Sequence, residues 1–125
     1  MLRKRGVDEE EVAQVLVRLL ESGGLDDERF ARSYAEDKRE LEGWGPERIR
    51  GALLARGLSE ELVDAALGAE DEPAQVERAV RVLAQRDARC DSDQARSRAL
   101  ALLARRGYPL EVAYEAVRKH ERRAA

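Results

Sequence analysis

The residues of this 125-residue chain that are best suited to chemistry are its cations and a few carboxylates. Asp26 and Asp27 are adjacent acids, and paired carboxylates can act as general acid and base in enzymes. Side chains of adjacent residues at a helix start point apart, however, and aspartate is a preferred helix cap. We therefore interpret both as capping residues and expect no catalytic residue.

The sequence has few residues that could support metal, redox or nucleophile chemistry. The single cysteine and the single histidine exclude an internal disulfide and a Cys/His zinc site within one chain. None of the five serines lies in a nucleophile-elbow pattern, and no Gly-rich phosphate loop is present. No apolar run reaches the length of a membrane span, and no signal peptide is visible. These features predict a cytoplasmic protein without cofactor, metal or membrane contact.

Basic residues gather toward the C-terminal end. The formal net charge of −3 is the balance of −8 over residues 1–93 and +5 over residues 94–125. Such a segment is either a solvated helix face with a basic tail or an electrostatic footprint for nucleic acid or an acidic protein. Only Tyr108 and Tyr114 accompany it, fewer aromatics than a single-strand binder usually has. The candidate partner-binding residues here are Arg96, Arg98, Arg105, Arg106, Arg118 and Lys119.

Two further candidate cations, Arg48 and Arg50, lie near a predicted helix start, where positive charge is slightly unfavourable. A binding partner would explain their position, and so would salt bridges to nearby glutamates. The glutamates available for such bridges are Glu47, Glu60 and Glu61.

The elements that must position these residues are helices. Ala, Leu, Glu and Arg dominate the composition, and apolar residues recur at helical spacing. We expect about seven helices. They lie over residues 9–22, then begin from Asp26, Pro46, Ser59 and Glu72, then follow a capping turn over residues 90–93, and the last begins at Pro109. The predicted buried faces include Phe30, Tyr34 and Leu41 in one helix and Val76, Val80, Leu83 and Ala84 in another. Trp44, in a Gly-rich turn, is expected to wedge between units or to anchor a partner.

A repeat of about 50 residues organises the chain. Gly6, Gly57 and Gly107 each follow an arginine and precede an apolar or aromatic residue, and then a residue that starts helices. A helix that ends at such a glycine can turn into a short helix in a new direction. We predict an all-α array of stacked three-helix repeats, elongated and curved. The expected divisions are a partial first repeat over 1–24, a second over 25–69 and a third over 70–125.

One block is specific enough to suggest a family. Its residues are Leu25, Asp26, Asp27, Phe30, Gly43, Trp44, Gly45, Pro46, Arg48, Ile49, Leu53, Gly57, Leu58 and Ser59. This block resembles the RecX family of bacterial recombinase regulators, and the segment from Leu102 to Val117 is similar to the C-terminal repeat of that family. Relative to the family pattern, the chain begins within the first repeat.

The resemblance implies a non-enzymatic modulator of the RecA recombinase in DNA repair and recombination. Such proteins bind the RecA filament on single-stranded DNA and inhibit its recombinase, ATPase and coprotease functions, and some bind DNA. Two alternatives remain open: a helical adaptor, and a DNA-binding module that acts through the C-terminal basic cluster. An incomplete first repeat would also leave an apolar edge for self-association, formed by Leu2, Val7, Val12, Val15 and Leu19.

Overall fold

The computed structural model describes residues 26–68 and 70–124, and every regular element in them is helical. A helix over residues 26–37 continues directly into a short π-helical segment. The elements after it are η1 (Lys38–Glu42), α2 (Pro46–Ala55), α3 (Glu60–Leu67), α4 (Glu72–Gln85), α5 (Asp93–Arg105) and α6 (Leu110–Ala124). The predicted helix over 9–22, the residue Leu25, the apolar edge and the partial repeat over 1–24 lie outside the described residues.

Three helices begin where the sequence supplies a cap. The side chains of Ser59, Asp71 and Ser92 each accept a hydrogen bond from the backbone N–H three residues further on, at 3.2, 3.0 and 3.1 Å. Pro46 occupies the first position of α2, where no N–H is needed. These caps satisfy backbone donors that a helix start leaves without partners.

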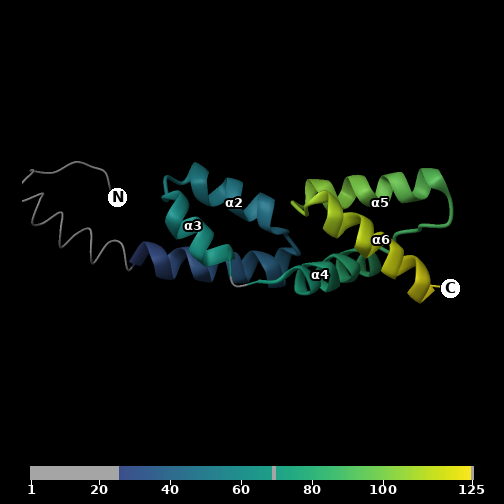
Figure 1. The fold of residues 1–125 in the computed structure, drawn as a ribbon, viewed down its shortest axis with the longest axis horizontal. Helices are drawn as coiled ribbons and strands as arrows, with labels where there is room; N and C mark the ends of the chain where they lie inside the picture. Colours follow the sequence, from purple (N-terminus) through teal and green to yellow (C-terminus); the bar gives the residue numbers. More distant parts are fainter. Residues whose placement is uncertain (1–25, 69, 125) are drawn as a thin grey trace, which may run out of the picture.

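The helices bury two separate apolar clusters, one at each end of an elongated body (Figure 1). The first is formed by the 26–37 helix, α2 and α3, with Ile49, Leu53 and Val63 at its centre. The second is formed by α4, α5 and α6, with Leu83, Leu103 and Val112 among its members. The predicted all-α helical repeat array is therefore confirmed, while the boundary between residues 69 and 70 stays a prediction.

Three residues expected in the core are exposed. Leu41 is 78% exposed, because η1 inserts a wider π turn that rotates it away from the face that carries Tyr34. Ala84 is exposed because the buried stripe of α4 ends at Leu83. Phe30 is 41% exposed and leans on Tyr34 at the margin of the first cluster.

Candidate partner-binding surface

The two clusters are joined through their backbones. Gly45 donates its N–H to the carbonyl of Arg106 at 2.7 Å, and Glu47 donates to the carbonyl of Gly107 at 2.9 Å. These bonds pair the loop before α2 with the turn between α5 and α6. We call this contact the junction, formed by residues 42–48 and 105–108.

Glycine is required on both sides of the junction. Gly107 has a φ of 97°, and a Cβ there would lie 2.4 Å from the backbone nitrogen of Arg48. A Cβ on Gly45 would lie 2.5 Å from the carbonyl oxygen of Gly107. The repeat glycine at 107 therefore ends a helix and also admits the neighbouring backbone.

Side chains close the junction around these bonds. The hydroxyl of Tyr108 donates to the carbonyl of Gly43 at 2.7 Å, and its burial raises the pKa of that phenol. Arg106 donates to the carbonyl of Glu42 at 2.9 Å, and Arg48 donates to that of Arg105 at 3.2 Å. Two cations predicted to bind a partner, Arg106 and Arg48, thus contribute to the internal architecture.

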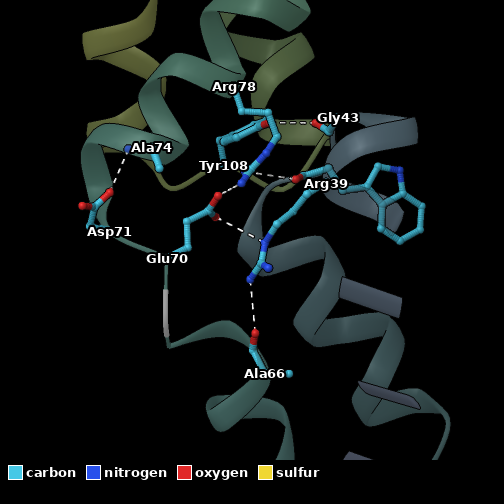
Figure 2. A network of polar contacts seen from close by, with 9 residues as sticks. Arg39, Gly43, Ala66, Glu70, Asp71, Ala74, Arg78 and Tyr108 are labelled. Atoms are coloured by element: carbon cyan, nitrogen blue, oxygen red, sulfur yellow. Dashed lines mark hydrogen bonds and ion pairs between the residues drawn. The ribbon is translucent and has the colours of Figure 1, made fainter. Parts of the chain in front are cut away.

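A half-buried carboxylate strengthens the same contact. Glu70, between α3 and α4, forms ion pairs with Arg78 and, at 3.4 Å, with Arg39 of η1 (Figure 2). Arg39 also donates to the carbonyl of Ala66 at 3.2 Å, and Arg78 donates to that of Trp44 at 3.5 Å. Desolvation lowers the pKa of both arginines, because burial disfavours their charged form.

The C-terminal cations do not form one open basic patch. Arg96 pairs with Glu121 at 2.9 Å, Arg118 with Glu115 at 2.6 Å and Lys119 with Glu77 at 3.5 Å. Hydrogen bonds from arginines lower the pKa of all three glutamates, Glu77 through Arg123. Within the described residues, Arg98 and Arg105 are exposed and their side chains form no ion pair. Half of the six predicted cations are therefore paired locally with a carboxylate.

Arg50 is also paired, but not with a residue anticipated from the sequence. It bonds to Asp64 of α3 rather than to Glu47, Glu60 or Glu61. The pair lines an open hollow of about 370 Å³ beside the end of α3. Because both partners belong to neighbouring helices of one unit, this pair explains the position of Arg50 without a binding partner.

Aromatic side chains form a line along the first unit. The rings of Phe30 and Tyr34 are 5.6 Å apart at an angle of 40°, and those of Tyr34 and Trp44 are 6.4 Å apart at 69°. Trp44 is half-buried against the first cluster, and the carbonyls of residues 43 and 44 reach the second unit. The tryptophan ring therefore packs within its own unit, while its loop makes the junction.

Three cations rest on these rings. The guanidinium of Arg56 lies 5.0 Å from the centre of Tyr34, the ammonium of Lys38 lies 4.7 Å from that of Trp44, and the guanidinium of Arg48 lies 4.2 Å from that of Trp44. We define the aromatic–cation row as the three rings and the three cations together: Phe30, Tyr34, Trp44, Lys38, Arg48 and Arg56. Sequence reasoning singled out Arg48 and missed Lys38 and Arg56. The available signals were the spacing of four between Tyr34 and Lys38 and the place of Arg56 before a repeat glycine.

The single cysteine and the single histidine both lie in the second unit. Within residues 26–68 and 70–124, no group of three or more His, Cys, Asp or Glu residues is placed to hold a metal ion. Cys90 is buried, which raises the pKa of its thiol, and His120 lies 2.8 Å from the carbonyl of Ala88. Of the described helices, none combines the length and the apolar character needed to cross a membrane.

Both the sequence and the fold of this chain are similar to those of RecX proteins. Residues 26–67 match the family model of the second three-helix domain of RecX. A regulatory protein RecX of Thermus thermophilus is 40% identical over 110 residues, which cover 88% of this chain and 70% of the relative. One from Mycobacterium sp. (strain JLS) is 34% identical over 123 residues, which cover 93% and 67%. The crystal structure of RecX from Lactobacillus salivarius has the same fold, with a TM-score of 0.75, 19% identity, and coverage of 92% of this chain and 77% of that one.

Proposed function

The chain belongs to the RecX family of regulatory proteins, and we propose that it binds the filament of the RecA recombinase on single-stranded DNA. It modulates the recombinase, ATPase and coprotease activities of that filament, without chemistry of its own. The observation that carries this proposal is the repeat array: two three-helix units coupled by a junction of backbone bonds into one elongated body (Figure 1).

An array of this kind suits a long partner. Repeat proteins use extended surfaces that cross several units, and such a surface needs a fixed geometry between the units. Here Gly45, Gly107 and Glu70 hold that geometry. A rigid body loses less entropy on binding than two units on a flexible tether, so more of its contact energy is available for affinity.

The experiment is an assay of ATP hydrolysis by RecA from a related bacterium on single-stranded DNA. We expect the protein to slow hydrolysis when present at fewer copies than RecA. Gly107→Ala, which disrupts the junction, is expected to weaken this effect, and Gly57→Ala serves as the matched control at an equivalent turn. Unchanged hydrolysis with the wild-type protein at equimolar amounts would overturn the proposal.

The sequence also raised direct DNA binding through the C-terminal basic cluster. Three of the six candidate cations, Arg96, Arg118 and Lys119, are each paired with a glutamate, and we therefore favour a protein partner. Neutralising four phosphates of a single strand would give log affinity a slope of about −3 against log salt. We expect a shallower slope than this. A slope of about −3 in the wild type, lost in the variants Arg98→Glu and Arg105→Glu, would favour DNA as the partner instead.

A further inference from the structure

The cations of the aromatic–cation row differ from most cations of their own unit. Arg32, Arg39 and Arg50 each form an ion pair with a carboxylate. None of the three row cations forms an ion pair within the described residues, although residues 26–70 carry a net charge of −5. These three positive charges are therefore left without a counter-charge in an acidic unit.

The rings hold these cations in place without using their hydrogen-bond donors. A cation–π contact is electrostatic and takes no N–H bond, so Lys38 keeps three donors and Arg56 keeps its guanidinium donors. Arg48 gives one of its N–H groups to the carbonyl of Arg105. Held on rings, the side chains lose less freedom when they meet an anion, which favours binding.

We propose that the aromatic–cation row binds a short acidic segment of a partner protein. Carboxylates of that segment would pair with Arg48, Lys38 and Arg56, where guanidinium–carboxylate contacts can be bidentate. An apolar side chain between the carboxylates would pack on Phe30, which is 41% exposed. The inference deepens the proposed function and rests on it only in taking the partner to be a protein.

A nucleic acid fits the row less well. Bases stack on open ring faces, whereas these rings are tilted by 40° and 69° to one another and carry cations. A long phosphate backbone would also be repelled by the net charge of −5 on the unit. A short segment with two or three carboxylates meets the three cations and avoids most of that repulsion.

Fluorescence anisotropy of a labelled synthetic peptide tests the proposal. The probe is a ten-residue peptide in which glutamates flank two leucines, and the comparison probes are its glutamine version and a ten-nucleotide oligo-dT. We expect the glutamate peptide to bind at least tenfold more tightly than either. The triple variant Lys38→Gln, Arg48→Gln, Arg56→Gln should lose at least tenfold in affinity.

The matched control removes three exposed cations outside the row, with Arg81→Gln, Arg98→Gln and Arg122→Gln. This variant has the same net charge as the row variant and should bind the glutamate peptide like the wild type. Equal losses of peptide affinity in both variants would mean unspecific charge attraction. If oligo-dT bound more tightly than the glutamate peptide and the row variant lost that binding, the row would be a nucleic-acid site. Either result overturns the proposal, and neither depends on the RecA assay.

Discussion

Two glycine turns of this molecule have the same backbone conformation but different roles. Gly57 and Gly107 have φ angles of 93° and 97°, and each follows an arginine and the end of a helix. The residue after each glycine donates to the carbonyl five residues earlier, at 3.3 and 3.1 Å. A Cβ at position 57 meets nothing within 4 Å, whereas at 107 it would strike Arg48. The same local sequence thus makes a turn in one place and an interface in the other.

The largest effect is expected when one methyl group is added to each turn. At either position alanine is strained by about 1–2 kcal/mol, because the φ is left-handed. Gly107→Ala also forces Arg48 and its backbone aside, so we expect a total loss of about 3 kcal/mol or more, against about 1 kcal/mol for Gly57→Ala. Urea unfolding followed by far-UV circular dichroism measures both. Equal losses would contradict a special role for the second turn.

The next effect concerns Glu70, the carboxylate between the two units. Glu70→Gln removes the ion-pair partner of Arg39 and Arg78 in a desolvated place, and we expect about 2 kcal/mol of lost stability. The control is Glu28→Gln, which breaks the exposed pair with Arg32 and should cost only a few tenths of a kcal/mol. Urea unfolding read out by the single tryptophan, Trp44, beside the junction would reveal the difference. A harmless Glu70→Gln would show that the pair adds nothing to the coupling.

A smaller effect is expected at Tyr108, the residue after the second glycine. Tyr108→Phe removes the hydroxyl that donates to Gly43 and leaves a carbonyl without that partner, at a cost of about 1 kcal/mol. Tyr114→Phe removes an exposed hydroxyl from α6 and should be neutral. Thermal unfolding of the two variants side by side checks this. A Tyr108→Phe protein as stable as Tyr114→Phe would assign the junction to its backbone bonds alone.

The smallest effect is a pH dependence of the second unit. Arginine hydrogen bonds lower the pKa of Glu121 and Glu115 in the folded state. Their contribution to stability is therefore complete above the unfolded carboxyl pKa of about 4.3, and it is lost as the pH falls through the lower folded value. Urea midpoints between pH 6 and pH 3 should fall less steeply in Glu121→Gln than in the wild type. Parallel curves would show that the Arg96–Glu121 pair carries no linkage.

The sequence predicted much of the fold because its signals are local. Ser59 caps a helix as expected, the turn over residues 90–93 supplies its cap through Ser92, and Gly57 and Gly107 make the turns of the repeat. Leu41 was misplaced because helical spacing assumes a regular α-helix, and the π turn of η1 changes the count. A single extra residue in one turn is enough to move a side chain from one face to another.

The candidate surface was harder to predict, because charge pairing is a property of the assembled helices. Arg96 and Glu121 are 25 residues apart, and nothing in their local sequence shows that they meet. The same holds for Arg50 and Asp64, which are 14 residues apart. Composition therefore indicated a basic cluster, whereas the structure pairs half of its candidate cations and places further unpaired cations on the rings of Tyr34 and Trp44.

The junction also bears on how such arrays can change over time. Its central bonds run from the amides of residues 45 and 47 to the carbonyls of residues 106 and 107. The side-chain requirement of these bonds is that positions 45 and 107 carry no Cβ atom. The side chains on the outer faces of α2 and α5 are then free to diverge without uncoupling the units. A connector made of backbone lets one three-helix unit acquire a new recognition surface while its neighbour keeps the old one.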